Sequence, residues 1–211
     1  MSAYDAVIAT IVVASDASSV TKSMVNSTQW RAGTSGTWLT TNPTLSAGNT
    51  YQFRTENANF GSWGTVLPNI KADVTVDWDT SGTVVTTIGD SFMRYYAYGC
   101  SSLTSLSVPD TSSVTSVGDD FMYKYAVDCS SLLRLELPSV GWFETNDVDW
   151  KVPSGRLNYL KGYVKNSTDL SDWKALTDTS GETLYTNYIR STDDVILEES
   201  KNTTNFFQFF N

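Results

Sequence analysis

The chain has 211 residues and a formal net charge of −9 at pH 7, and 40% of its residues are hydrophobic. A chain of this size can bury its own core, and its negative charge repels phosphate backbones, so we expect no nucleic-acid partner. It contains no histidine, which excludes Ser-His-Asp and Cys-His catalysis as well as histidine-ligated metals.

Composition favours a β-rich fold. Ser and Thr make up about a quarter of the chain and aromatic residues 13%, and hydroxylated, β-branched and aromatic side chains suit a pleated, half-buried surface. We therefore predict a mainly β protein with short helices (α+β). It would comprise an N-terminal antiparallel β-unit over residues 1–72, a repeat region over 73–153 and a helix–strand cap over 154–211.

The N-terminal region shows β-like runs at 6–14, 36–41 and 50–55, separated by turn signals. The first run follows Asp5 instead of a basic stretch and is too short to span a bilayer. We therefore expect neither a classical signal peptide nor membrane insertion. This region is either a separate subdomain, which we favour, or a cap on the first turn of the repeat region.

A possible cation loop follows this region. Asp77, Asp79 and Ser81, followed by Gly82, match the start of a calcium-binding loop, but the position that should carry a bidentate glutamate is Ile88. The sequence therefore favours an acidic strand end with a glycine turn over a calcium site.

An internal repeat organises the middle of the chain. Residues 88–110 match residues 117–139 at an offset of 29, with 12 of 23 positions identical. One such unit cannot cover its own apolar face, whereas stacked units bury columns of like side chains. The predicted columns are Phe92 over Phe121, Ala97 over Ala126 and Cys100 over Cys129.

Two further interpretations follow from the repeat. Asp90 and Asp119 each precede a Phe-Met pair, and we expect them to cap short helical turns. The two cysteines would be close enough for a disulfide, but we favour a ladder of buried thiols that behave as small hydrophobic groups.

The pattern Ile-Gly-x-x-Phe, Ala, Cys-Ser-Ser-Leu-Thr-Ser-Leu and Pro within residues 88–109 resembles the BspA-like (Treponema-type) leucine-rich repeat. This chain differs by about six extra residues per copy, at 93–98 and 122–127. Residues 152–163 and 170–176 also resemble the stretch that closes such arrays. The resemblance covers roughly residues 74–178 and implies a short solenoid and a surface or adhesion protein that is not an enzyme.

Several residues are candidates for contacts with a partner. Positions in the inserted segments that differ between the copies, together with polar residues of the concave strand, would face a partner, and exposed tyrosine gives large contact area at low entropic cost. The candidates are Arg94, Tyr95, Tyr98, Tyr123, Lys124, Arg134 and Glu136.

The C-terminal region predicts short helices at 156–165 and 171–176 and a strand at 182–190. The last residues carry four phenylalanines, Phe206, Phe207, Phe209 and Phe210. Such a tail would aggregate if left exposed. It either folds back on its own domain or docks on a neighbouring subunit, and both alternatives stay open.

No nucleophile, phosphate-loop or metal motif is present, so we expect no enzyme activity and no cofactor. The favoured function is a structural subunit of an extracellular or viral assembly, located outside the cell, on its surface or in a virion. It would contact copies of itself through its termini and the solenoid flank. The alternative is an adhesin or receptor-binding module that recognises a host protein or glycan through the variable repeat face.

Overall fold

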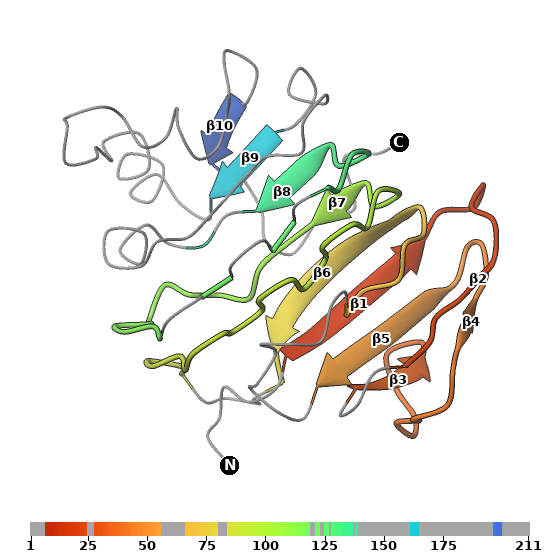
Figure 1. Cartoon of the computed structure of the whole chain (residues 1–211), viewed down its shortest axis with the longest axis horizontal. Helices are drawn as coiled ribbons and strands as arrows, with labels where there is room; N and C mark the ends of the chain where they lie inside the picture. Colours follow the sequence, from red (N-terminus) through yellow and green to blue (C-terminus); the bar gives the residue numbers. More distant parts are fainter. Residues whose placement is uncertain are drawn as a thin grey trace.

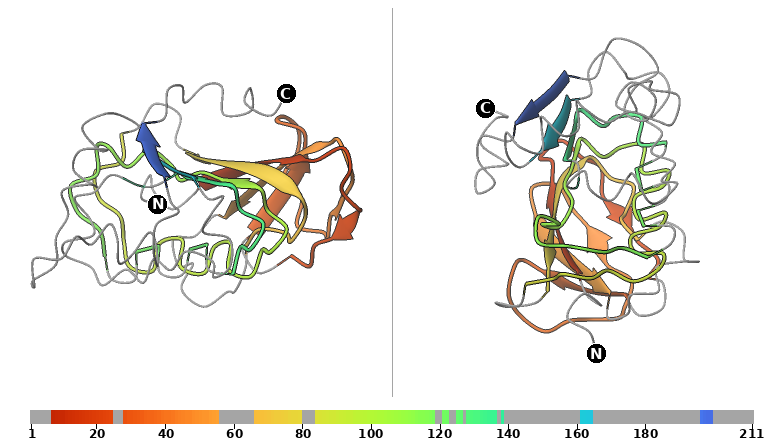
Figure 2. Two further views of the ribbon diagram at one scale, coloured as in Figure 1. Left: turned by 90° about the horizontal axis from the view of Figure 1, so that it is seen from above. Right: turned by 90° about the vertical axis from the view of Figure 1, so that its left-hand side faces the viewer.

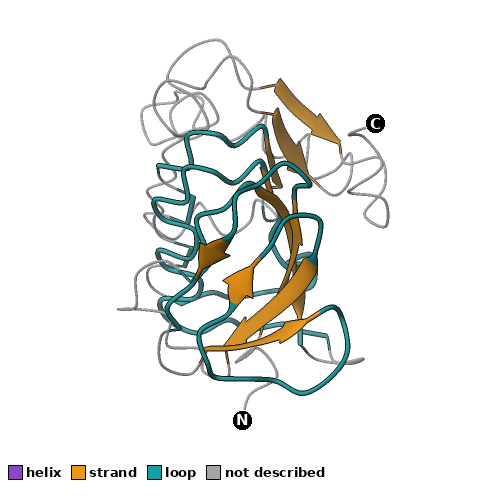
Figure 3. Ribbon diagram, turned by 90° about the vertical axis from the view of Figure 1, so that its right-hand side faces the viewer, coloured by secondary structure: helices purple, strands orange, loops and turns teal. Residues whose placement is uncertain are grey.

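The computed structural model describes residues 7–24, 28–55, 66–79, 84–118, 121–122, 125–126, 128–136, 138, 161–164 and 196–199. Within these ranges the protein is mainly β and contains no helix (Figure 3). The strands are β1 (Val7–Val13), β2 (Val20–Thr21), β3 (Thr28–Ala32), β4 (Thr44–Leu45), β5 (Thr50–Thr55), β6 (Ala72–Trp78), β7 (Ser105–Leu106), β8 (Arg134–Glu136), β9 (Lys161–Val164) and β10 (Ile196–Glu199).

Eight of these strands form one mixed sheet in the order β10-β9-β8-β7-β6-β1-β5-β3, and β2 pairs with β4 in a separate small sheet (Figure 1). The part from β3 to β6 is antiparallel, and the part from β6 to β10 is parallel. The predicted boundary at 72/73 coincides with the start of β6, and the division into domains stays a prediction.

The N-terminal strands follow from alternating side chains. In β1 every second residue is fully buried, and the residues between them are half-buried, as expected for a strand with one face on the core. The predicted runs at 6–14 and 50–55 are confirmed as β1 and β5. The run at 36–41 is wrong as a strand, because only Leu39 bridges to Trp30.

The strand in that part of the chain is β3, which the sequence analysis missed. Gly33 and Gly36 both adopt positive φ, a conformation that glycine reaches without steric cost. They turn the chain back along β3, so Leu39 meets Trp30 through two backbone hydrogen bonds of 2.8 and 2.9 Å. Contact at one residue is too short to make the predicted strand.

The two copies of the repeat pair in register. Ser105 lies opposite Arg134 and Leu106 opposite Leu135 in the parallel β7–β8 pair, which reproduces the 29-residue offset. A second parallel ladder runs along the loops, where Thr87 bridges to Ser116. Two separate ladders with the same offset fix one copy directly beside the next.

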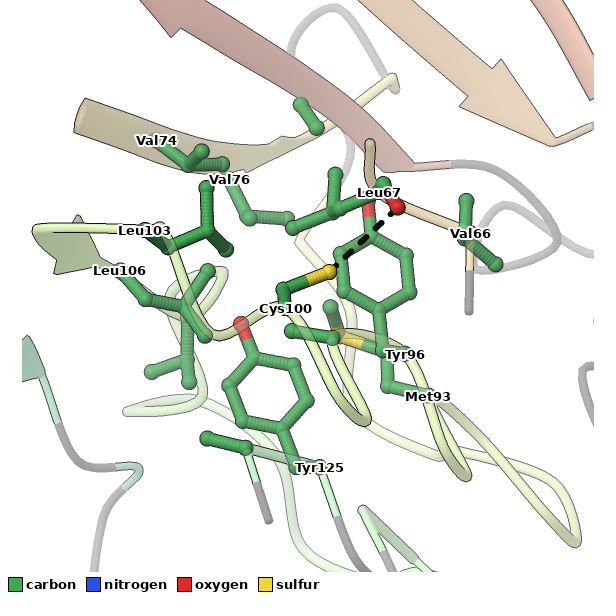
Figure 4. Close-up of a cluster of buried hydrophobic side chains, with 14 of the residues drawn as sticks. Val66, Leu67, Val74, Val76, Met93, Tyr96, Cys100, Leu103, Leu106 and Tyr125 are labelled. Carbon is green, nitrogen blue, oxygen red and sulfur yellow. Dashed lines mark hydrogen bonds between the residues drawn. The ribbon is translucent and has the colours of Figure 1, made fainter. Parts of the chain in front are cut away.

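Aromatic side chains stack between the copies inside the core. The Phe92 and Phe121 rings lie 5.9 Å apart at 10°, and the Tyr96 and Tyr125 rings lie 5.7 Å apart at 12°. The predicted Phe92–Phe121 column is confirmed. Figure 4 shows Tyr96 and Tyr125 on either side of Cys100, with Tyr125 below Leu106 and both rings below the β6 residue Val76.

The C-terminal prediction needs one correction. Residues 161–164 lie inside the predicted helix 156–165, but they form β9, whose Lys161 and Gly162 pair with Arg134 and Leu135 of β8. Three apolar residues at helical spacing are a weak local signal, and the open edge of β8 offers backbone partners that satisfy this segment as a strand. The predicted helix 171–176, the strand 182–190, Asp119 and residues 205–211 lie outside the described residues.

Candidate functional site

The candidate site lies on the loop segment 90–99, which we call the turn ribbon. Figure 2 shows this yellow-green segment on the side of the molecule opposite the sheet. Its backbone forms overlapping four-residue β-turns, each closed by a hydrogen bond from the fourth residue to the first. Arg94 N–H donates to Ser91 O, Tyr96 N–H to Met93 O and Tyr98 N–H to Tyr95 O, each at 3.2 Å. The ribbon therefore presents a regular array of side chains without being a helix.

The expectation that Asp90 caps a helical turn is therefore wrong. Ser91, Met93 and Tyr95 have φ between 54° and 58°, which places a left-handed residue at the third position of two successive turns. The neighbouring copy takes backbone groups that a helix would use, because Met122 N–H donates to Phe92 O at 2.6 Å. Pairing between copies replaces helix formation here.

The ribbon divides its side chains between the core and the surface. Phe92, Met93, Tyr96 and Ala97 are buried, whereas Arg94 and Tyr95 are half-buried and Tyr98 is 39% exposed. The buried members anchor the ribbon, so the other three are held on a rigid base. We call Arg94, Tyr95 and Tyr98 the ribbon cluster.

Two contacts join the ribbon cluster. The Tyr95 and Tyr98 rings meet edge to face, with centroids 5.6 Å apart at 86°, a favoured aromatic geometry. The Arg94 guanidinium carbon lies 5.2 Å from the Tyr95 ring centroid, within the range of a cation–π contact. The cluster thus combines a cation and two aromatic rings, which are chemically suited to recognition.

The other predicted contact residues have different outcomes. Tyr123, Lys124, Phe206, Phe207, Phe209 and Phe210 lie outside the described residues. Arg134 and Glu136 are only 7% and 4% exposed, so the expectation that they line an open concave surface is wrong. Every residue of β8 is buried, on both faces of the strand, whereas the sequence analysis assumed that one face is open to solvent.

Three polar residues form a row across the sheet. Asp73, Ser105 and Arg134 are register partners on β6, β7 and β8. Burial raises the pKa of the Asp73 carboxyl, and this is partly offset by a 2.9 Å hydrogen bond from Thr104 Oγ1 and by the charge of Arg134. Ser105 and Arg134 are buried and Asp73 is half-buried, so the row offers little open surface to a partner.

The two cysteines are free and fully buried, which confirms the thiol ladder. Cys100 Sγ–H donates to Leu67 O at 3.4 Å (Figure 4), and Cys129 Sγ–H donates to Ala97 O at 3.0 Å. Burial raises the pKa of Cys100 to about 12 and that of Cys129 further. The thiols therefore stay protonated and unreactive near neutral pH.

The calcium interpretation gains no support from the environment of its residues. Asp79 Oδ2 lies 3.3 Å from Arg54 Nη1, so a guanidinium already compensates this carboxylate, and Ser81 is not described. In the described part of the chain, no group of three or more acidic or cysteine side chains is placed to hold a metal ion. In the same part, no helix is long and apolar enough to cross a membrane.

Sequence reasoning missed a second polar cluster, formed by Arg31, Trp38 and Arg54 on the outer face of β3 and β5. The guanidinium carbons of Arg31 and Arg54 each lie 4.3 Å from the centroid of the Trp38 ring. The alternation in Thr28–Ala32, which puts Arg31 on the face opposite the core, was the available signal. The comparisons with known proteins add no further residues: no protein-family model, curated protein or solved structure matches the chain.

Proposed function

We propose that this protein is a non-enzymatic structural subunit of an extracellular or viral assembly, which self-associates through its termini and the flank of its repeat region. The repeat region would be a short BspA-like leucine-rich-repeat solenoid, closed by C-terminal helix and strand segments. The observation that carries the proposal is the ribbon cluster, which holds the half-buried Arg94 and Tyr95 beside the exposed Tyr98 on a base of stacked, buried side chains.

Rigidity supports this function. The ribbon is anchored by Phe92 and Tyr96, which stack on the next copy, so little side-chain entropy is lost when Tyr98 contacts a partner. Tyrosine and arginine are also enriched among the residues that dominate binding energy at interfaces. A surface of this kind is well suited to repeated contacts between subunits.

Charge supports a second copy as the partner. The chain carries 23 acidic and 14 basic residues, so another copy offers many carboxylates to Arg94. Like-charged surfaces repel one another, and a local cation beside exposed rings marks a place where two such acidic chains can approach.

The oligomeric state tests the proposal. Sedimentation equilibrium and negative-stain microscopy of the full chain should show a discrete oligomer, filament or shell at micromolar concentration. Tyr98→Ala should weaken association at least about tenfold, the scale of a tyrosine interface anchor. Leu39→Ala, which truncates a side chain of nearly equal exposure (40% against 39%), is the matched control and should leave association unchanged.

A chain ending at residue 204 tests the contribution of the C-terminal tail in the same assay. Loss of assembly with retained folding would show that the tail docks on a neighbouring subunit, whereas loss of folding would show that it packs within its own subunit. A wild-type protein that remains a folded monomer at about 100 μM would contradict self-association, because specific assemblies normally bind more tightly than this.

The second candidate function is an adhesin or receptor-binding module. It is favoured by the difference between copies at the ribbon cluster, where Arg94, Tyr95 and Tyr98 are replaced by Tyr123, Lys124 and Val127. Such variation suits a surface that contacts a foreign partner. A monomeric wild type that binds a host protein or glycan, and loses this binding on Tyr98→Ala, would support this function instead.

A further inference from the structure

A second surface of the sheet gathers positive charge on this acidic chain. Arg31 lies on β3 and Arg54 on β5, and their register partners Gln52 and Gln29 show that all four share the outer face of the sheet. Trp38 belongs to the segment that follows β3, and the centroid of its ring lies 4.3 Å from the guanidinium carbon of each arginine. We call Arg31, Trp38 and Arg54 the arginine–tryptophan site.

The two arginines differ in how their charge is balanced. Arg54 has an ion pair with Asp79 at 3.3 Å. Arg31 donates from Nε and Nη2 to the neutral Gln52 Oε1 at 2.9 and 2.6 Å, and from Nη1 to Gly36 O at 3.5 Å. Within the described ranges, no carboxylate forms an ion pair with Arg31. The charge of Arg31 is therefore balanced by no carboxylate of the described residues, and its guanidinium lies against the Trp38 ring.

The site is held in place before any ligand arrives. Gln52 Nε2 donates to Thr10 Oγ1 at 2.9 Å, which orients the amide so that its oxygen faces Arg31. Gln29 Oε1 likewise accepts from Nε and Nη2 of Arg54 at 2.9 and 2.7 Å. Each guanidinium thus has one edge fixed by a glutamine, and the terminal nitrogens of Arg31 retain hydrogens for an incoming acceptor.

We propose that the arginine–tryptophan site binds the carboxylate or sulfate group of an acidic glycan. A planar guanidinium fork matches the two oxygens of such a group. A glycan is favoured over an acidic peptide because the groups around the Arg31 fork are the neutral Gln52 and Thr10 side chains and the Trp38 ring, which suit sugar hydroxyls and the face of a sugar. This site lies on the N-terminal strands and is independent of the ribbon cluster and of self-association.

Binding of defined polymers to the full chain tests this inference. The probes are heparin, which carries sulfate, polygalacturonate, which carries only carboxylate, neutral dextran, and poly-glutamate as a peptide carboxylate. Isothermal titration calorimetry at low ionic strength should detect binding of heparin if the site takes sulfate, or of polygalacturonate if it takes carboxylate, and should detect no binding of dextran. Arg31→Gln should weaken this binding at least about tenfold, the scale for loss of a charge-assisted bidentate contact.

Lys71→Gln is the matched control. Lys71 is an exposed cation paired with Asp16 outside the site, so its loss changes the net charge equally and should alter affinity less than about twofold. Arg31→Lys keeps the charge without the fork and should give intermediate affinity. If Arg31→Gln fails to fold by circular dichroism, Arg31→Lys decides the outcome alone.

Three results would overturn the proposal. The first is that the wild type binds neither acidic glycan. The second is that the wild type and the folded Arg31 variants bind with equal affinity. The third is that poly-glutamate binds as tightly as either glycan. The last result would assign the site to a protein partner.

Discussion

Replacing Gly118 with alanine is expected to lower the free energy of unfolding by about 3 kcal/mol, the upper range for overpacking of a close contact. A Cβ atom at Gly118 would collide with the backbone nitrogen and carboxylate of Asp90 and would lie 2.7 Å from its Cα. Gly118 N–H also donates to Ile88 O at 2.9 Å. The alanine would therefore push the two copies apart, because backbone atoms cannot rotate out of the way.

The repeat supplies the matched control. Gly89 occupies the same position in the first copy, but a Cβ there would meet nothing within 4 Å. Gly89→Ala should therefore change the free energy of unfolding by less than about 1 kcal/mol. Urea denaturation followed by circular dichroism measures both variants. Equal effects at the two glycines would show that the copies do not approach each other as described.

Replacing Phe121 with alanine is expected to cost about 3–5 kcal/mol, the usual range for a buried phenylalanine. Phe121 is fully buried and stacks on Phe92, which in turn lies 5.2 Å from Trp78. Removing it would leave a cavity at the end of this aromatic column and would expose one face of Phe92 to that cavity. Since domains are stable by only about 5–15 kcal/mol, the variant should unfold at a much lower urea concentration than the wild type.

Phe121→Leu separates loss of volume from loss of stacking. Leucine fills much of the site, so it should cost less than half as much as alanine. Combining each change with Phe92→Leu measures the coupling, which is expected to be about 0.5–1.5 kcal/mol for a stacked aromatic pair. Additive effects of the two leucine variants would contradict direct contact between the rings.

The stacking of the copies was predictable because it depends on identity at a fixed offset. Phe92 and Phe121 are the same residue type 29 positions apart, and a unit that cannot bury its own apolar face must place them together. The thiol ladder followed from the same reasoning. Strand β1 was predictable because its buried and half-buried residues alternate over seven positions, and β5 because Tyr51 and Phe53 alternate with polar residues in the sequence.

The remaining features depend on contacts between segments that are distant in the sequence, so they cannot be predicted from neighbouring residues. The segment at 161–164 has a helix-like spacing of apolar residues, but its conformation follows from the free edge of β8. The turn ribbon contains Ser91, Met93 and Tyr95 in left-handed conformations that cost about 1–2 kcal/mol each. Burial of the ribbon and its backbone pairing with neighbouring segments offset this cost, so no local propensity could have indicated it.

The candidate surfaces were likewise predictable from the sequence only in part. Arg94, Tyr95 and Tyr98 could be selected because they differ between the copies, whereas the buried Met93, Tyr96 and Ala97 do not. Arg134 and Glu136 were selected as polar residues of the predicted concave strand, but that strand is buried on both faces. The arginine–tryptophan site was missed because its three residues come from two strands and a loop, and only the register of β3 against β5 brings them together.

The most direct test of the in-register stacking is a disulfide engineered between the copies. Thr87 and Ser116 are exposed register partners, and Ser116 Oγ lies 3.4 Å from Thr87 Oγ1. Thr87→Cys with Ser116→Cys should therefore form a disulfide under mild oxidation, seen by mass spectrometry, while the buried native thiols stay reduced. Thr87→Cys with Ser113→Cys, displaced by about 10 Å along the ladder, should stay reduced. Efficient cross-linking of the displaced pair, with none in the register pair, would contradict the 29-residue stacking.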